Sequence, residues 1–307
     1  MFAKLKSFKI EKSIAGILLM IVHAASMAAL YVTAKNLTHV LHPHQVAFLY
    51  KFSILVAILP WCMHGGFKKN LKTTKIGVHV TRGTFSVMAN LCFFYSLTAI
   101  NVIDAAAITY LEHIIVVSIG IFYFKEHFTK AKIILIACGF VGAIFVTKPG
   151  FNEFNSKYFF IFLALIFWAV NNLSIKILGK TERGKAQLFY VMLIGSIFAL
   201  PFAIQNWQPI KPEYIKYLAL LALFHLIHVI SFFKAFKFSD ISAVMPFDYS
   251  RLVFTGLLGY LFLHEMPDKY SIIGYLLIMA GGLYLIKSET KRNAELKNQK
   301  VEEKISG

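Results

Sequence analysis

The sequence predicts an all-α membrane protein, with ten transmembrane helices arranged as two inverted five-helix repeats. Three observations predict this fold class. Of the 307 residues, 58% are apolar or aromatic and only 15% are charged, whereas soluble domains average about 25% charged residues. The charges also leave long uncharged runs between them, and the second half of the chain repeats landmarks of the first.

The uncharged runs define the expected helices. A bilayer core requires about 20 apolar residues of helix, and lipid offers no partner to an unpaired backbone group, so each span must be helical. The alternating pattern of a membrane β-barrel is missing from the sequence. We expect spans over residues 13–34, 44–63, 76–99, 102–124, 131–147, 157–178, 186–204, 214–237, 241–263 and 270–286.

The spans differ in how many charges they carry. The first, seventh and tenth carry none, and the fifth, sixth and eighth carry charges only near their ends. The first span follows four lysines and resembles a secretory signal peptide, but its apolar run is long for a signal, so an uncut helix is expected. The remaining spans contain charges away from their ends: Lys51, Arg82, Glu112, Asp248 and Arg251, with Asp104 near the start of the fourth span.

The distribution of cations predicts the topology. If the N-terminus is cytoplasmic and the spans alternate, 22 of the 32 Lys and Arg residues fall in inner segments and five in outer segments. Positively charged loops stay inside, so both termini are expected in the cytoplasm, with the chain integral to a bacterial inner (plasma) membrane. The net charge of +17 is therefore a topology signal, and no nucleic-acid partner is expected because no soluble basic face is predicted.

The same pattern divides the chain into four parts. Residues 1–12 form a cytoplasmic segment, 13–150 the first repeat, 151–287 the second repeat, and 288–307 a charged cytoplasmic tail. The tail is polar enough to be partly disordered. The sequence leaves the oligomeric state undetermined, and a homodimer is one of the possible assemblies.

An internal repeat relates the two halves. Each half has five expected spans, an odd number, so the second half must enter the membrane in the opposite direction. Inverted repeats of this kind are a transporter architecture. The matched pairs are Lys35 with Lys176 and Pro60 with Pro201 at an offset of 141, then Tyr110 with Tyr249, Glu126 with Glu265 and Gly142 with Gly281 at 139.

Glu112 and Arg251 are the leading candidates for a binding site. A charge at the centre of a membrane helix costs about 2.5–3.5 kcal/mol on insertion scales. Glu112 lies eight residues after Asp104, about 12 Å into its span, and the repeat makes Arg251 its equivalent. We expect both to face a shared cavity and a zwitterionic substrate. The alternatives are a structural ion pair between the halves, or local pairing of Arg251 with Asp248.

Asp248, Tyr110 and Tyr249 are further candidates for substrate binding. Asp248 is suited to accept a substrate amine or to carry a coupling proton, and neutralisation of Arg251 is its alternative role. The two tyrosines are suited to line a cavity by stacking and hydrogen bonding, or simply to pack.

A second set of polar residues is assigned to substrate hydrogen bonding, gating or coupling. Interhelical hydrogen bonds and, for Arg82, contact with lipid headgroups are the alternatives, and Lys51 is also expected to reach outward. No metal site and no cofactor are expected. The candidates are Asn90 and Asn171 for substrate binding, and Arg82, His225 and His228 for gating or coupling.

Two segments carry a family resemblance. Residues 105–150 contain ITYLEHIIVVSIGIFYFKEHFTK and residues 238–287 contain MPFDYSRLVFTGLLGYLFLHEMPDKY. Each has a Glu after the fourth span of its half and small residues in the fifth. The pattern resembles paired EamA domains of the drug/metabolite transporter superfamily over about residues 13–287. The resemblance implies a ten-helix carrier with a central cavity for a small molecule.

Shorter segments, among them LHPHQVAFLYKF and VHVTRG, look most similar to bacterial uptake carriers for S-adenosylmethionine. One departure is Lys51, where many relatives carry Arg. We therefore expect a secondary transporter that works by alternating access, with S-adenosylmethionine uptake as the leading function. Transport of amino acids or other metabolites in either direction is the alternative. A membrane-embedded enzyme is remote, because the sequence has no catalytic motif such as HExxH or GxSxG.

Overall fold

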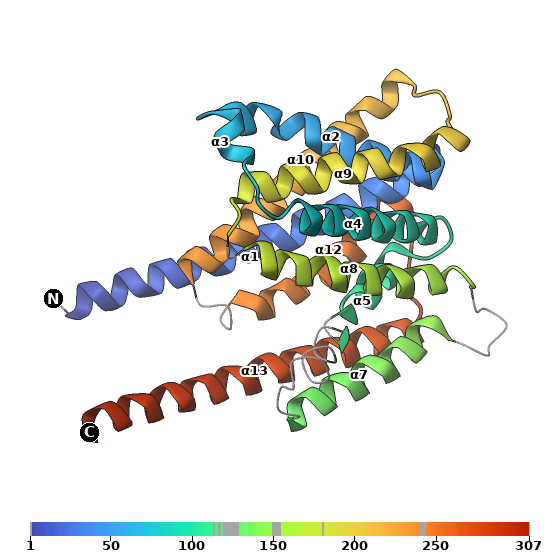
Figure 1. Ribbon diagram of the computed structural model, residues 1–307. Helices are drawn as coiled ribbons and strands as arrows, with labels where there is room; N and C mark the ends of the chain where they lie inside the picture. The colour runs from blue at the N-terminus through green and yellow to red at the C-terminus, as the bar shows by residue number, and fades with distance from the viewer. Residues whose placement is uncertain are drawn as a thin grey trace.

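The computed structural model describes the backbone of residues 2–112, 114, 115, 118, 129–148, 155–179, 181–239 and 244–306, and their side chains except at 2–13, 176, 289, 293, 294 and 296–306. Over these ranges the chain is helical and contains no strand (Figure 1). The helices are α1 (Phe2–Thr38), α2 (Pro43–Met63), α3 (Phe67–Leu71), α4 (Ile76–Leu97), α5 (Val102–Thr109), α7 (Lys130–Thr147), α8 (Tyr158–Leu178), α9 (Gly184–Gln205), α10 (Pro212–Phe238), the 3₁₀ helix η1 (Met245–Tyr249), α12 (Ser250–Leu263) and α13 (Lys269–Ser306).

Seven of the described helices are long and apolar enough to cross a membrane, judged by length and composition: α1, α2, α7, α8, α9, α10 and α13. The helices at the other three expected spans, α4, α5 and α12, fall short of that standard. The outer surface of the bundle suits lipid, because large apolar side chains project from it. Phe140, Phe159 and Val253 are each more than 60% exposed, which is unusual for a protein surface in water.

The fourth and ninth spans are interrupted, whereas the sequence predicted continuous helices over 102–124 and 241–263. In the first half, α5 ends at Thr109, and Tyr110 and Leu111 form a turn before Glu112 is helical again. In the second half, η1 ends at Tyr249, where α12 begins. Pro246 lacks a backbone N–H and disfavours a regular α-helix there. Both interruptions therefore include one of the repeat-matched tyrosines, Tyr110 and Tyr249.

The helix ends also differ from the prediction. Helix α1 begins at Phe2 instead of residue 13, and α13 continues to Ser306, so the described backbone of the expected disordered tail is helical. An ion pair between Lys291 and Glu295, four residues apart at 3.9 Å, suits a solvated helix. The short helix α3 was not predicted.

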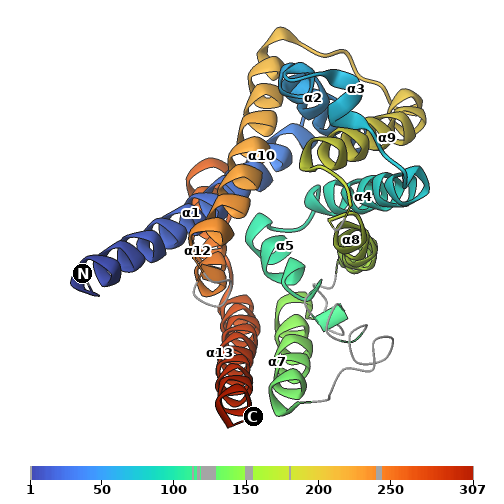
Figure 2. The same cartoon turned by 60° about the vertical axis from the view of Figure 1, so that its left-hand side comes forward.

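The helix contacts occur in matching pairs when α1, α2 and α4 of the first half are set against α8, α9 and α10 of the second. Helix α1 packs on α10, while α4 packs on α8; α4 also packs on α9, while α2 packs on α10. Helix α2 packs on α9, and α7 packs on α13. Figures 1 and 2 both place α7 and α13 side by side at one edge, joined to the other helices through α5 and α12. Counterparts run in opposite directions in Figure 1, as α1 does relative to α8 and α4 relative to α10.

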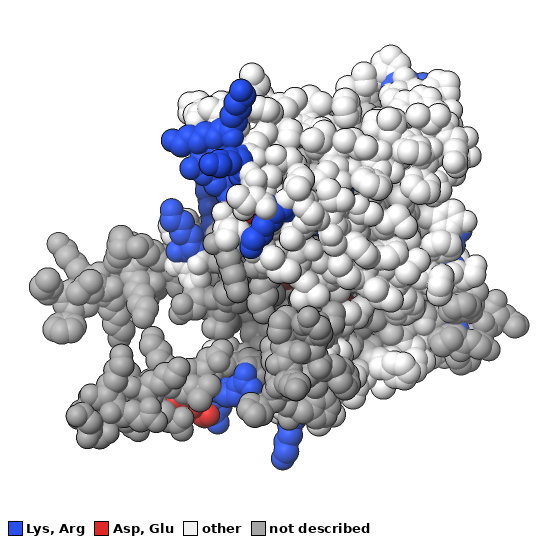
Figure 3. Space-filling model, viewed as in Figure 1, with Lys and Arg blue, Asp and Glu red and all other residues white. Residues whose placement is uncertain are grey.

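Both ends of the chain lie on the same side of the bundle (Figure 1). Lys and Arg side chains gather on that side, over α3 and its neighbouring loops (Figure 3). Among the described residues there, Lys68, Lys69, Lys72 and Arg183 are exposed. This basic end is the one that carries the termini.

Candidate functional site

Buried polar side chains from both halves meet at the middle of the bundle. They come from α1, α2, α5 and the turn after it, α10, η1 and α12. Because lipid and apolar cores leave buried polar atoms without partners, the contacts among these residues determine what the site can bind.

Arg251, in the first turn of α12, lies at the centre of this cluster. Its side chain is 9% exposed, and its Nη2 lies 3.9 Å from Oδ2 of Asp248, the local pairing that their spacing allowed. Its Nε donates to Tyr110 Oη at 3.1 Å. The guanidinium also lies over two aromatic rings, 4.3 Å from the centroid of Tyr110 and 5.9 Å from that of Tyr31. These contacts fix a buried cation between the halves.

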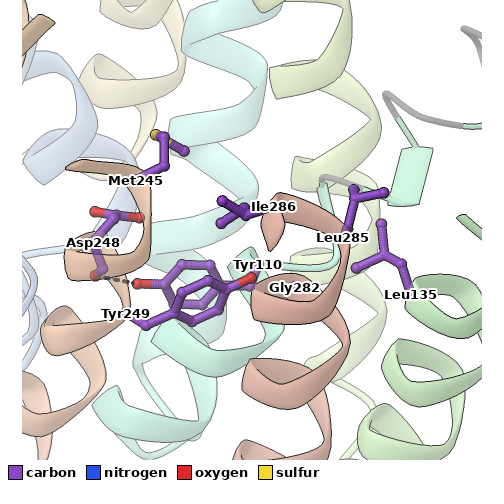
Figure 4. Close-up of a pocket in the computed structure, with 8 residues that line it drawn as sticks. All are labelled: Tyr110, Leu135, Met245, Asp248, Tyr249, Gly282, Leu285 and Ile286. Carbon is purple, nitrogen blue, oxygen red and sulfur yellow. Dashed lines mark hydrogen bonds between the residues drawn. The ribbon is translucent and has the colours of Figure 1, made fainter. Parts of the chain in front are cut away.

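Tyr110 and Tyr249 stack directly on each other. Their ring centroids are 4.6 Å apart and their planes are inclined by 15°. Tyr110 Oη donates to the backbone carbonyl of Asp248 at 2.7 Å (Figure 4). A small cavity borders the stack, lined by Tyr110, Leu135, Met245, Asp248, Tyr249, Gly282, Leu285 and Ile286. Gly282 is required here, since a Cβ at this position would overlap the hydroxyl of Tyr249.

Three histidines form a series of contacts that reaches Asp248. His225 and His228 of α10 approach through His228 Nε2 and His225 Nδ1 at 3.3 Å, and Tyr50 Oη lies 2.7 Å from the same Nδ1. His23 of α1 bonds through Nδ1 to the backbone carbonyl of His228 at 2.9 Å. His23 Nε2 lies 3.4 Å from Oδ1 of Asp248. The two histidines expected to couple or gate transport are therefore linked to Asp248 through a third.

The Glu112 carboxylate is hydrogen-bonded to Asn172, whereas the Arg251 side chain contacts Asp248 and Tyr110. Glu112 Oε1 accepts a hydrogen bond from Asn172 Nδ2, and Asn171 Nδ2 donates to Asn172 Oδ1 at 3.1 Å. The structure thus joins Glu112 and Asn171 through Asn172, on α8, while Arg251 is held by Asp248 and Tyr110. The repeat equivalence of Glu112 and Arg251 does not by itself make them a pair.

Lys51 is buried, not directed outward as the sequence suggested. It is 3% exposed, and its Nζ donates to Ser86 Oγ at 2.8 Å. Ser86 lies on the same face of α4 as Asn90, which is 7% exposed, and as Arg82. Arg82 bonds to α9, because its Nη1 donates to Gln187 O and Oε1 at 3.1 and 3.3 Å. The α4 face therefore carries a polar strip toward α2 and α9.

Sequence reasoning missed Tyr31, Tyr50 and Ser86, and it gave Lys51 the wrong direction. It considered Asn172 together with Asn171, and His23 together with the other histidines within spans, but selected neither of them as a site residue. The signal for Asn172 was its adjacency to Asn171, and the signal for Ser86 was its place four residues from both Arg82 and Asn90 on one helical face. His23 had no repeat counterpart to distinguish it. Among the described residues, no group of three or more His, Cys, Asp or Glu side chains is arranged to hold a metal ion.

Comparison with known proteins identifies the family. The sequence profile of the EamA-like transporter family matches residues 14–148 and 155–287. The S-adenosylmethionine uptake transporter of Rickettsia prowazekii is 28% identical over 260 residues, covering 85% of this chain and 88% of its own. The riboflavin transporter of Vibrio cholerae is 24% identical, covering 83% of this chain and 87% of its own. One solved crystal structure superposes with a TM-score of 0.57 at 18% identity, covering 94% of this chain and 99% of the other, and so shares the fold.

Proposed function

Because the chain belongs to the EamA-like transporter family, whose profile covers nearly all of it, we propose that it is a secondary transporter working by alternating access. The chain is an integral membrane protein of a bacterial membrane, and its family and named relatives point to the transport of a small metabolite rather than to an enzyme. A membrane-embedded enzyme is left only as a remote alternative.

The observation that carries the mechanism is the stack of Tyr110 on Tyr249. In a molecule with two related halves, equivalent residues touch only where the pseudo-two-fold axis passes between them. The packing of α1 on α10 and of α8 on α4, which are repeat-equivalent pairs, has the same symmetry. Both features support two inverted five-helix repeats, with ten spans in all, placed around a central site. The two separate profile matches support repeat boundaries near 13–150 and 151–287.

The substrate we propose is S-adenosylmethionine, taken up into the cell. The named function of the Rickettsia relative supports this choice. The polar cluster offers matching chemistry: Arg251 for the carboxylate, Glu112 or Asp248 for cationic centres, and the tyrosine stack for the adenine ring. Asn90 and Asn171 would add hydrogen bonds, with Arg82, His225 and His228 acting in gating or coupling. Import or export of an amino acid or of another metabolite is the alternative, and the relative named as a riboflavin transporter supports a metabolite other than S-adenosylmethionine.

The membrane orientation we propose places the basic end of the bundle, with both termini, in the cytoplasm and the chain in the inner membrane. The exposed lysines of α3 support this orientation, because cationic loops are retained inside.

Reconstitution in liposomes tests the function. Liposomes preloaded with unlabelled S-adenosylmethionine should take up the labelled compound by exchange, and unlabelled S-adenosylmethionine outside should compete with it. If riboflavin or amino acids exchange and S-adenosylmethionine does not, the alternative substrate class replaces it. Failure of every one of these solutes to exchange would refute the carrier assignment.

Substrate protection against heat unfolding tests the site. Glu112→Gln and Arg251→Gln should each lose the rise in melting temperature that the exchanged solute gives the unaltered protein. Lys211→Gln is the matched control, because Lys211 has a side chain 66% exposed and lies outside the cluster. Full protection in both site variants would remove Glu112 and Arg251 from the binding site.

A further inference from the structure

A buried ion pair joins the two halves of the bundle at the end opposite the termini. Lys35, in the last turn of α1, contacts Oε1 of Glu265 in the connection between α12 and α13. The two side chains are 6% and 12% exposed. Lys35 Nζ also donates to the backbone carbonyl of Ile100, and Glu265 Oε2 accepts from the backbone N–H of Val102 at 2.7 Å. The pair therefore fastens α1, the start of α5 and the end of α12 to one another.

The helices that the pair fastens lead directly to the candidate site. The N-cap residue of α5, Asn101, makes no side-chain cap of its own. The Glu265 carboxylate caps this helix from the other half instead, where an anion suits the positive end of the helix dipole. Helix α5 ends immediately before Tyr110, and the first turn of α12 contains Arg251. Separation of the ion pair would therefore release both site-bearing helices at the same end.

Apolar side chains surround the ion pair at this end of the bundle. Leu37, Ile100 and Val102 are each at most 2% exposed, although they lie at helix ends or in the connection between helices. Connecting segments ordinarily run over the surface of a protein. Their burial here means that the described residues around the pair exclude water from it.

We propose that Lys35 and Glu265 are the outer gate of the carrier, and that the pair separates to admit a solute to the site at Arg251. This inference rests on the proposed function as a carrier and adds the residues that control entry from outside. The repeat gives both residues a counterpart of the same charge, Lys176 and Glu126, although Glu126 lies outside the described residues. The two charges therefore belong to the repeat and not to the outer end alone.

Both states of the gate leave its two charges compensated. With the gate closed, the Lys35 ammonium and the Glu265 carboxylate compensate each other in a buried site. With the gate open, entering water hydrates both ions. The attraction within a buried pair is largely offset by the loss of hydration, so the gate can open without a large penalty. Removal of one partner is different, because it leaves the other charge buried and uncompensated in the closed state alone.

Access to Thr109 from outside the cell tests the gate. Thr109 is the last residue of α5, is 5% exposed and interacts with Tyr31 of α1, so it lies behind the closed pair. The reporter protein carries Thr109→Cys with the three native cysteines replaced by alanine, and spheroplasts receive an impermeant maleimide. Lys35→Gln and Glu265→Gln should each make the reporter react at least about tenfold faster, because each leaves one uncompensated charge that opposes closure.

Two further variants separate gating from a general loss of packing. Lys35→Gln combined with Glu265→Gln should react more slowly than either single variant, since no uncompensated charge then remains buried. Lys148→Gln is the matched control, because it removes the ion pair to Asp268 at 2.6 Å, which joins α7 to the start of α13 at the edge of the bundle. It should react like the reporter protein. Unchanged rates in both single variants, additive acceleration in the double variant, or equal acceleration in Lys148→Gln would each overturn the gate.

Cys62 shows whether a single variant has loosened throughout. It is fully buried near the inner end of α2. Retained as the only cysteine in permeabilised spheroplasts, it should stay as unreactive in Glu265→Gln as with the native pair, and faster reaction would overturn the gate. Exchange of labelled S-adenosylmethionine by the unaltered protein, with no change in Thr109→Cys labelling, would overturn the gate and leave the carrier intact. If S-adenosylmethionine, riboflavin and amino acids all fail to exchange, the proposed function and this inference fall together.

Discussion

The two stacked tyrosines have different hydrogen bonds although they occupy equivalent positions in the repeat. Tyr110 Oη donates to the Asp248 carbonyl at 2.7 Å and accepts from Arg251 Nε at 3.1 Å. The Tyr249 hydroxyl instead lies against Gly282. The two matched tyrosines are therefore alike in their aromatic packing and differ in their polar contacts.

We predict that Tyr110→Phe destabilises the protein more than Tyr249→Phe. Loss of the Tyr110 hydroxyl leaves the Asp248 carbonyl and the Arg251 Nε without this partner, which costs about 1–3 kcal/mol for buried groups. Both variants keep the ring stack, so packing is matched between them. Thermal unfolding in detergent checks the difference, and equal melting temperatures for the two variants would contradict it.

At the residue scale, the sequence could identify Arg251 and Asp248 because three-residue spacing on a helix brings side chains together. It could also identify the two tyrosines, since the repeat paired them. It could not assign Asn172 to Glu112 or His23 to Asp248. Those contacts join different helices, and their geometry depends on helix rotation and on the interruptions at Tyr110 and Tyr249, which hydropathy does not encode.

Among the helices, α7 and α13 approach each other unusually closely through glycines. A Cβ at Gly274 would lie 2.6 Å from the Gly142 carbonyl oxygen and 2.6 Å from Val146 Cγ2, and a Cβ at Gly142 would lie 2.9 Å from the Gly274 carbonyl. Small residues permit such close backbone contact in membrane bundles. Gly142 and Gly274 therefore serve the close packing of α7 on α13.

We predict that Gly274→Ala lowers stability although alanine favours helices. The clash involves backbone oxygen, which cannot rotate away, and overpacking of this kind costs about 1–3 kcal/mol. Gly77→Ala is the matched control within α4, because a Cβ there meets nothing within 4 Å. A higher melting temperature for Gly77→Ala and a lower one for Gly274→Ala are expected, and a rise in both would refute the close contact.

Asp268 caps α13 and also connects it to α7. Its Oδ1 accepts from the backbone N–H groups of Tyr270 and Ser271 at 2.8 and 3.2 Å, and Oδ2 accepts from Lys148 Nζ at 2.6 Å. Burial opposes its ionisation, but the hydrogen bonds from Lys148 and Ser271 outweigh burial and lower the pKa of Asp268 to about 2.

This cap predicts a pH dependence. A carboxyl whose pKa is lower in the folded state stabilises the fold above its ordinary pKa near 4, and that contribution is lost as the pH falls from 4 toward 2. Asp268→Ala should cost about 0.5–2 kcal/mol at neutral pH, the usual range for a lost N-cap. Asp268→Asn should lose less, since its side-chain oxygen still accepts from the backbone. Melting curves between pH 3 and 7 check both, and Asp268→Asn should show the flatter acid limb.

At the element scale, hydropathy located every described long helix, because span length is set by the bilayer. It did not locate the break at Tyr110, where no proline or glycine marks the turn. Hydropathy also made α1 start too late, at residue 13 instead of Phe2, and made α13 end too early, at residue 286 instead of Ser306. A charged segment outside the bilayer can still be helical when its residues have good helix propensity.

For the whole molecule, the count of cations and the repeat make the same prediction about orientation. The basic loops beside α3 and both termini lie at one end of the bundle (Figures 1 and 3), and the connections before α8 and after α9 both belong to the other end if the ten expected spans alternate. Labelling of single cysteines separates these positions. The native Cys62, Cys92 and Cys138 are first replaced by alanine.

In spheroplasts, an impermeant maleimide should label Ser156→Cys and Asn206→Cys, which are exposed in the expected outer loops. Thr74→Cys and Gly184→Cys are equally exposed but should react only after the membrane is permeabilised, because the cationic loops that hold them remain in the cytoplasm. Reaction of the second pair alone would reverse the orientation and keep the inverted halves. Reaction of Thr74→Cys together with Asn206→Cys would break the inverted arrangement, since these positions follow the second long helix of each half, α2 and α9, and inverted halves place them on opposite sides.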